Sequence, residues 1–360
     1  MTSVLVVDDS QFMRTVIGNI LADNGYEVFS ASDGRAAVKA VAERDPDIVT
    51  MDVEMPGMGG IEAVAEIMST HPTPILMISA HTEAGADATF EALDEGAVDF
   101  LAKPSGEVSP NIASLADRLI EKVATVGRAD VSSIDLEQDD SARDVTATTG
   151  TQTPADHPGR SFVEHPTVVV GASTGGPKIV ERLLRELPVS LDAKVIVVQH
   201  MPESFTDRLA ARLDRVTNYD VTEAADGLRI GPGEVVIARG NYHLEVVANV
   251  AGRIRMRLSQ DERRHGVRPA IDVTMETAAK RVRDPLCAVT LTGMGRDGAA
   301  GTCAVKEAGG TTIAQDEATS PVFGMPKQAI QTGCVDHVLP DEAIPNALCS
   351  VFTQEAQTHG

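Results

Sequence analysis

The sequence predicts two α/β domains: a doubly wound domain of five strand–helix repeats, and a second domain with a mostly parallel sheet and an inserted β-hairpin. Its 360 residues, 42% of them apolar, suffice for two hydrophobic cores and exceed the usual size of one. Strand-length apolar runs alternate with amphipathic helices in two separate stretches of the chain. This alternation is typical of parallel sheets that helices cover on both faces.

The first alternating stretch covers about 125 residues from the start of the chain. Each apolar run precedes a segment with one apolar face, which predicts parallel strands joined by crossover helices. The expected strands are residues 3–7, 27–31, 48–52, 75–79 and 100–101.

The second alternating stretch begins at Thr167. Between Val235 and Leu258, the segments HLEVV and IRMRLS alternate with a period of two, which predicts a hairpin inserted into the α/β order. The other strands expected here are residues 167–171, 194–199, 235–238, 288–292 and 311–314.

Residues from about 126 to 164 lack this periodicity. They are rich in Asp, Ser, Thr and Ala and contain almost no large apolar side chains, a composition that predicts a disordered linker. We therefore expect one domain at residues 1–122, a flexible acidic linker at 123–165 and a second domain at 166–352.

The formal charge of −22 argues against a nucleic-acid-binding protein, because contacts with phosphates require a basic face. Only eight of the 31 basic residues are lysines, and the acidic residues are spread along the whole chain. We hypothesise a surface adapted to high salt, where repulsion between carboxylates is screened; an ordinary acidic protein is the alternative. A stability series in rising KCl decides between them, because no gain above physiological salt would exclude the halophilic hypothesis.

Two features indicate a cytoplasmic protein. No apolar run approaches the roughly 20 residues of a membrane helix, and no secretory signal follows Met1. The four cysteines have no C-x-x-C spacing, so neither a zinc site nor a disulfide framework is indicated. We expect buried, reduced thiols at Cys287, Cys303, Cys334 and Cys349.

Polar residues gather at the carboxyl ends of the first domain's strands, where open α/β sheets bind their ligands. Asp8 and Asp9 follow the first strand, Asp52 ends the third, Ser79 ends the fourth and Lys103 follows the fifth. Three converging carboxylates repel one another unless a cation joins them, and hard oxygen ligands suit Mg²⁺. Asp52 can then attack a phosphoryl donor while Lys103 and Ser79 contact the phosphoryl oxygens. The expected product is an aspartyl phosphate.

The strings VLVVDDS, MDVEMPGMGGIEA, PILMISAHT and GAVDFLAKP resemble the receiver domain of response regulators, over essentially all of residues 1–122. The resemblance implies that Asp52 is the phosphoacceptor and that Asp8 and Asp9 are metal ligands. It also implies that Ser79 and Lys103 are the switch residues, which reorganise their face of the domain when Asp52 is phosphorylated.

In the second domain, Ser173 lies in the string GASTGGPKIVERLL, in a tight strand-to-helix turn that fits the G-x-S-x-G pattern. Such a turn exposes the hydroxyl beside helix N–H groups, which favours either an oxyanion or a phosphate. A dinucleotide-binding loop would need an acidic residue at the end of the second strand to hold the ribose. That strand ends instead in Gln199 and His200, and His200 is placed to be the general base for Ser173.

A third polar residue follows the strand expected at 288–292, in the string TLTGMGRDGAAG. Asp297 could hold His200 in the required tautomer and stabilise its imidazolium, or it could simply cap the following helix. The chain order Ser173, His200, Asp297 differs from the trypsin-like, subtilisin-like and α/β-hydrolase orders, so analogy to those folds is unsafe.

The strings GASTGGP, VVQHMP, RRHGVRPAIDVTMETAA and TLTGMGRDGAAG resemble the catalytic domain of the CheB-type chemotaxis glutamate methylesterases, over roughly residues 166–352. The resemblance implies that Ser173 is the nucleophile, His200 the base and Asp297 the orienting acid. It places the oxyanion donors at the backbone N–H groups around Thr174 and Met294. It also implies that Arg268 lies on the receptor-binding side of the cleft. We expect His243 and His265 to be surface or core histidines.

The implied function is a phosphorylation-activated protein-glutamate methylesterase that also deamidates receptor glutamines. Its expected partners are methyl-accepting chemotaxis receptors as substrate and a chemotaxis histidine kinase as phosphodonor. We expect Mg²⁺ in the receiver domain, no cofactor for the esterase chemistry, no nucleic acid, no membrane insertion and a monomer. The alternatives are a nucleotide-binding module and a nicotinamide-dependent oxidoreductase. Ser173→Ala would weaken affinity only modestly in a binding module, and binding of a nicotinamide nucleotide would indicate the oxidoreductase.

Overall fold

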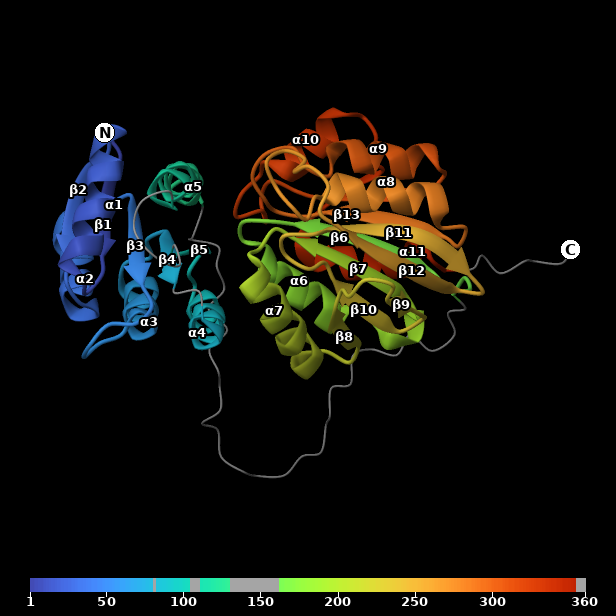
Figure 1. The fold of residues 1–360 in the computed structure, drawn as a ribbon, viewed down its shortest axis with the longest axis horizontal. Coiled ribbons are helices and arrows are strands. Elements are labelled where there is room, and N and C mark those ends of the chain that lie inside the picture. Colours follow the sequence, from blue (N-terminus) through green and yellow to red (C-terminus); the bar gives the residue numbers. More distant parts are fainter. Residues whose placement is uncertain (80–81, 104–110, 130–161, 354–360) are drawn as a thin grey trace, which may run out of the picture. The chain divides into compact units, whose positions relative to one another are not determined.

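The computed structural model describes residues 1–79, 82–103, 111–129 and 162–353. They form parts of two compact units, Met1–Leu136 and Glu137–Gly360, which are considered separately (Figure 1). Residues 130–161, most of the predicted linker, lie outside the described residues. Among the helices of the described ranges, none is both long and apolar enough to cross a membrane.

The N-terminal unit is a five-stranded parallel sheet with the strand order β2-β1-β3-β4-β5. Its central strands are buried along their whole length, as expected for a sheet that helices cover on both faces (Figure 1). Side chains cap three of its helices, at Ser10, Asp33 and Thr82. The elements are β1 (Ser3–Val7), α1 (Gln11–Asp23), β2 (Glu27–Ala31), α2 (Gly34–Arg44), β3 (Ile48–Asp52), α3 (Gly60–Thr70), β4 (Ile75–Ser79), α4 (Glu83–Asp94), β5 (Asp99–Ala102) and α5 (Asn111–Val126).

The C-terminal unit contains a seven-stranded sheet with the order β15-β14-β13-β6-β7-β10-β8, in which all pairs are parallel. The strands are β6 (Thr167–Ala172), β7 (Lys194–Gln199), β8 (Asp220–Glu223), β10 (Glu234–Ile237), β13 (Leu286–Thr290), β14 (Thr311–Gln315) and β15 (His337–Leu339). Figure 1 shows α8 and α9 together on one face of this sheet and α6 and α7 on the other. The helices are α6 (Gly176–Glu186), α7 (Glu203–Val216), α8 (Ile271–Arg281), α9 (Ala299–Glu307), α10 (Met325–Gln331) and α11 (Ile344–Val351), with short 3₁₀ helices η1 (Val189–Leu191) and η2 (Asp341–Ala343).

The predicted hairpin is confirmed as β11 (His243–Val250) and β12 (Arg253–Ser259), which pair antiparallel. A short strand, β9 (Arg229–Ile230), joins them in a separate three-stranded sheet. Leu244 and Met256 from the hairpin share one buried cluster with Met275 of α8. Burying side chains of this size stabilises the unit by about 1.5–3 kcal/mol each, so the hairpin anchors α8.

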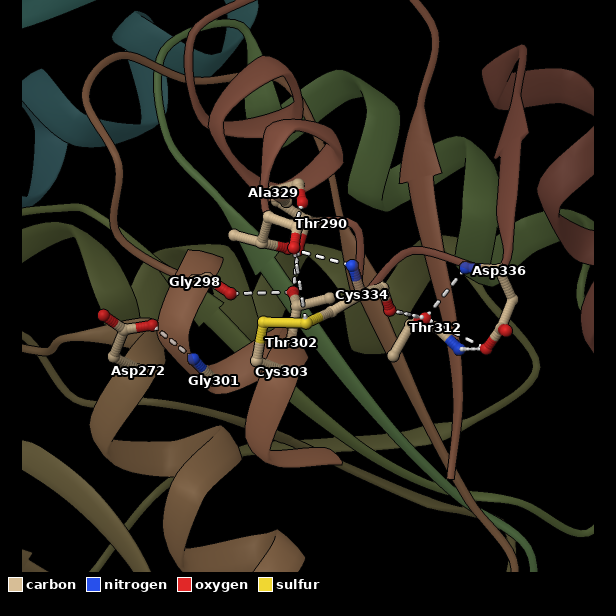
Figure 2. Close-up of a disulfide and its surroundings, with 11 residues drawn as sticks. Asp272, Thr290, Gly298, Gly301, Thr302, Cys303, Thr312, Ala329, Cys334 and Asp336 are labelled. Atoms are coloured by element: carbon tan, nitrogen blue, oxygen red, sulfur yellow. Dashed lines mark hydrogen bonds between the residues drawn. A yellow bond between two sulfur atoms is a disulfide. The ribbon is translucent and has the colours of Figure 1, made fainter. Parts of the chain in front are cut away.

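The prediction that all four cysteines are reduced is wrong. Cys303 of α9 and Cys334, which follows α10, form a disulfide (Figure 2), while Cys287 and Cys349 are buried thiols outside this bond, as expected. The two bonded residues are 31 positions apart, and only the packing of α9 beside α10 brings them together. The spacing of the cysteines in the sequence therefore could not predict this disulfide.

Reduction of this disulfide is expected to lower the stability of the C-terminal unit. Cross-linking residues that are 31 positions apart removes loop entropy from the unfolded chain, a contribution of about 3–4 kcal/mol in the chain-entropy model. The melting temperature should then fall by about 6–16 °C in a reducing agent. The control is the double variant Cys303→Ser/Cys334→Ser, whose melting should not respond to reductant; equal melting of the oxidised and reduced wild type would contradict the prediction.

Candidate functional site

Ser173 occupies the turn between β6 and α6. Its N–H donates to the carbonyl of Thr292 (3.0 Å), and its carbonyl accepts from the N–H of Gly176 (2.8 Å), the first residue of α6. Gly175 caps the helix at φ 74°, a left-handed conformation that favours glycine. Gly293 closes the other side, where a Cβ would stand only 2.7 Å from the Cβ of Ser173. The glycines thus let the backbone fold tightly around the serine at the carboxyl edge of the sheet.

His200 follows β7, the neighbour of β6 in the sheet. Ala172 pairs with Gln199, and the N–H of His200 donates to the carbonyl of Ala172 (3.0 Å), so Ser173 and His200 follow adjacent strand ends. Gln199 is buried, and its Nε2 donates to the carbonyl of Ser173 (2.8 Å). An amide that serves the serine turn is not the acidic ribose ligand that a dinucleotide site requires.

Asp297 lies between β13 and α9, and its Oδ2 is 2.8 Å from Nε2 of His200. The same oxygen accepts from the N–H of Ile271 (2.7 Å), and Oδ1 accepts from the N–H groups of Asp272 and Gly298 (3.0 Å each). Burial alone would raise the pKa of Asp297, but the hydrogen bond and charge of His200, together with these backbone donors, outweigh it and hold the pKa below its usual value. Asp297 is therefore an ionised acceptor at neutral pH.

No hydrogen bond joins the Ser173 hydroxyl to the His200 ring within the described residues. Because Asp297 faces Nε2, the ring nitrogen left for the serine is Nδ1. Contacts of this kind are often loose in the absence of substrate. Thr174 and Met294 lie in the two turns beside Ser173, and the carbonyl of Thr174 accepts from the Thr292 hydroxyl (2.9 Å).

Arg268 is committed to contacts within its own domain. Its Nη1 donates to the carbonyls of Gln260 (2.7 Å) and Asp261 (2.9 Å), and its Nη2 donates to Asn241 (3.0 Å). These bonds hold together the loop that follows the hairpin and the turn that precedes it. Any contact of Arg268 with a substrate would have to be made alongside these three bonds.

Two side chains near Asp297 were not predicted as site residues. His265 lies 4.0 Å from Asp297 and 2.8 Å from Asp272, which is itself fully buried. His243, by contrast, is a core histidine that accepts from the N–H of Ala270 (3.2 Å). Both Asp272 and His265 lie in the string RRHGVRPAIDVTMETAA, which carries the family resemblance but assigns neither residue a role.

In the N-terminal unit, Lys103 joins two of the predicted carboxylates. Its Nζ is 2.8 Å from Asp52 and 3.1 Å from Asp8. Asp8 and Asp52 are buried whereas Asp9 is exposed, yet each of the three offers an oxygen within 4.8 Å of the others. Burial raises the pKa of Asp52, Lys103 partly offsets this, and the charges of Asp8 and Asp9 raise it further.

The donor set of this acidic cluster fits a hard divalent cation. Oδ2 of Asp8 is buried and receives no hydrogen bond of acceptable geometry, although it lies at ion-pair distance from Lys103. A buried carboxylate oxygen left in this way, with two further carboxylates beside it, matches the oxygen ligands that Mg²⁺ prefers.

Ser79 ends β4, the strand next to that of Asp52. Its hydroxyl donates to the carbonyl of Gly85 (2.9 Å) and accepts from the hydroxyl of Thr89 (2.7 Å). Both partners belong to α4, so Ser79 connects the acidic edge of the sheet to that helix.

Comparisons with known proteins identify the family of each half of the chain. The family model of the CheB methylesterase matches residues 168–348, and that of the response regulator receiver domain matches residues 4–109. A protein-glutamate methylesterase/protein-glutamine glutaminase of Halobacterium salinarum is 52% identical over 97% of this chain and 98% of its own length. One of the same description from Pyrococcus horikoshii is 43% identical over 96% of this chain and 92% of its own length.

The crystal structure of the Thermotoga maritima CheB methylesterase catalytic domain has a TM-score of 0.50 and 43% identity, covering 53% of this chain and 99% of that one. A further relative, from Haloarcula marismortui, is 51% identical over 98% of each chain. The acidic composition of this sequence, with its charge of −22, fits its similarity to proteins of halophiles.

Proposed function

Because the chain belongs to the CheB methylesterase family and carries a receiver domain ahead of the catalytic one, we propose that Ser173, His200 and Asp297 are its catalytic triad. The reaction is hydrolysis of glutamyl γ-methyl esters on chemotaxis receptors, with deamidation of receptor glutamines by the same residues. The observation that carries the proposal is the 2.8 Å contact between His200 and a buried, ionised Asp297, beside the serine turn.

In the first half of the reaction, Oγ of Ser173 attacks the ester carbonyl carbon while Nδ1 of His200 takes the hydroxyl proton. The N–H groups of Thr174 and Met294 stabilise the tetrahedral oxyanion. Collapse of this intermediate breaks the bond to the methoxy oxygen, which leaves as methanol with the proton from His200. Asp297 accepts the hydrogen bond from the Nε2–H group of His200 throughout and stabilises the imidazolium.

In the second half, His200 removes a proton from water, and the resulting hydroxide attacks the acyl-enzyme. The bond to Oγ of Ser173 breaks, the proton returns to the serine, and the free γ-carboxylate leaves. A glutamine substrate follows the same course, with ammonia leaving in place of methanol.

Phosphorylation of Asp52 controls this activity. An oxygen of Asp52 attacks phosphorus in a phosphohistidine of the kinase, and the phosphorus–nitrogen bond breaks. Lys103 neutralises phosphoryl oxygens, and Ser79 donates to one of them after leaving its contacts with α4. Asp8, Asp9 and Asp52 would hold Mg²⁺, which supplies further neutralisation of phosphoryl charge.

The remaining features of the proposal follow from the family and the composition. The proposed domains are residues 1–122 and 166–352, with the linker at 123–165, and α5 extends the first domain into that range as far as Val126. The receptors are the substrate, and a chemotaxis histidine kinase is the phosphodonor. The protein works in the cytoplasm as a monomer, without nucleic acid or membrane insertion, and Arg268 faces the receptor.

Asp52→Asn is expected to abolish control by phosphorylation. The amide is a poor nucleophile, so a small phosphodonor with Mg²⁺ should raise methanol release from methylated receptor membranes in the wild type only. The unstimulated rate should persist in the variant, because Asp52 belongs to the other domain. Asp23→Asn, the same change at an exposed position of α1, is the matched control. Normal stimulation of Asp52→Asn would refute this assignment.

A further inference from the structure

A second buried carboxylate lies beside the catalytic acid and has no role in the steps above. Asp272, near the start of α8, is fully buried, and one of its oxygens lies within 4.8 Å of one from Asp297. Two such carboxylates repel each other, and burial in an apolar interior adds to the cost. The groups that surround the two carboxylates must therefore offset this repulsion and the cost of burial.

Each of the two acids accepts hydrogen bonds from the start of a helix beside the other acid. Asp297, just before α9, accepts the N–H groups of Ile271 (2.7 Å) and Asp272 (3.0 Å) at the start of α8. Asp272 in turn accepts the N–H of Gly301 (2.7 Å) in the first turn of α9 (Figure 2). Neither helix has a capping side chain at its own N-cap, Ala270 or Gly298. The orientation of Asp297 is thus coupled to the position of Asp272.

Two basic side chains, His265 and Arg264, lie against Asp272. His265 Nε2 is 2.8 Å from Oδ2 of Asp272 and 4.0 Å from Oδ1 of Asp297, so the ring stands near both carboxylates. The guanidinium of Arg264 is 3.4 Å from Asp272 and 2.7 Å from Glu276, one turn further along α8. These contacts hold the carboxylate of Asp272 in one orientation. They engage Asp272, so that Asp297 can accept the hydrogen bond from His200.

We propose that Asp272, itself oriented by His265 and Arg264, is a positioning residue that fixes the catalytic acid Asp297 toward His200. It acts through Asp297 and does not touch the substrate. The inference rests on the triad proposed above and extends it by a second carboxylate and its histidine. Gly301 and the N-terminus of α9 complete the arrangement, because they fix the backbone from which Asp297 projects.

A double-mutant cycle tests this proposal with methanol release measured at varied receptor concentration. Asp272→Asn is expected to lower kcat by about tenfold or more, the size seen when an orienting group behind a functional ligand is removed. KM should stay within about twofold, because Asp272 makes no substrate contact. In an Asp297→Asn background the same change should alter kcat by less than about twofold, since the group it orients has already lost its function.

The cycle separates positioning from stability. A merely structural Asp272 would lower activity by the same factor in both backgrounds, or would change only the melting temperature, and either result would overturn the proposal. An increase in KM at constant kcat would also overturn it, because that result means substrate contact. Asp220→Asn, at an exposed position of β8, is the matched control for removal of one carboxylate charge.

His265 provides the second arm, which keeps the test decisive if Asp272→Asn fails to fold. His265→Gln keeps a hydrogen-bond donor and should retain more of kcat than His265→Ala, with both losses disappearing in the Asp297→Asn background. His337→Gln, at an exposed position of β15, is its control. Equal activity of both His265 variants and the wild type would overturn the role of His265. If Asp297→Asn itself left kcat unchanged, the proposed triad would fail and the positioning role of Asp272 would fall with it, whereas a large loss in Asp297→Asn with no effect of Asp272→Asn would overturn the Asp272 inference alone.

Discussion

Ser173→Ala is expected to lower phosphodonor-stimulated methanol release by at least about a thousandfold. The variant loses the nucleophile, so no acyl-enzyme can form, and the oxyanion donors and binding contacts alone leave only a small residual rate. The measurement is release of methanol from methylated receptor membranes, in high salt with Mg²⁺, for the wild type and the variant side by side.

Ser190→Ala is the matched control, because it removes the same hydroxyl from an exposed position of η1. It should leave the rate unchanged. If the C-terminal domain were a binding module, Ser173→Ala would weaken affinity modestly and there would be no esterase rate to lose. If the rate of Ser173→Ala stayed within tenfold of the wild-type rate, another group would have to be the nucleophile.

Asp297→Asn is expected to lower kcat by about four powers of ten with little change in shape of the site. The carboxylate accepts hydrogen bonds from His200 and from two backbone N–H groups of α8, and its pKa lies below the usual value, so it works as an anion. An amide cannot accept at both positions with the same strength, and it can present its own N–H to the ring. His200 then loses the tautomer that accepts the serine proton.

Single-turnover methanol release and thermal melting together check this prediction. The melting temperature must be measured together with the rate, because Asp297 also caps α8 and loss of this cap costs about 1 kcal/mol of stability. Recovery of the rate at higher pH would indicate that only the ionisation of His200 had changed. A loss smaller than tenfold in a folded variant would contradict the assignment of Asp297 as the orienting acid.

Much of the fold was readable because it depends on local patterns. Strands such as β3 and β7 are mostly apolar, since both faces of a parallel sheet are buried, and their ends were predicted to the residue. The strands β8 and β15 escaped prediction because they are short edge strands with polar or exposed side chains. Residues 286–287 of β13 were likewise missed at the start of a strand whose remainder was expected.

The sequence by itself determined the fold class and which strand ends carry Ser173, His200 and Asp297, because hydrophobic periodicity marks where strands stop and turns begin. It also identified the family, through motifs at those turns and in residues 263–279. Only the tertiary structure decided that Cys303 and Cys334 are bonded, and that Asp272 and His265 stand behind Asp297. These contacts depend on how α8, α9 and α10 pack on one face of the sheet. Side chains that helix packing brings together leave no periodic signal in the sequence.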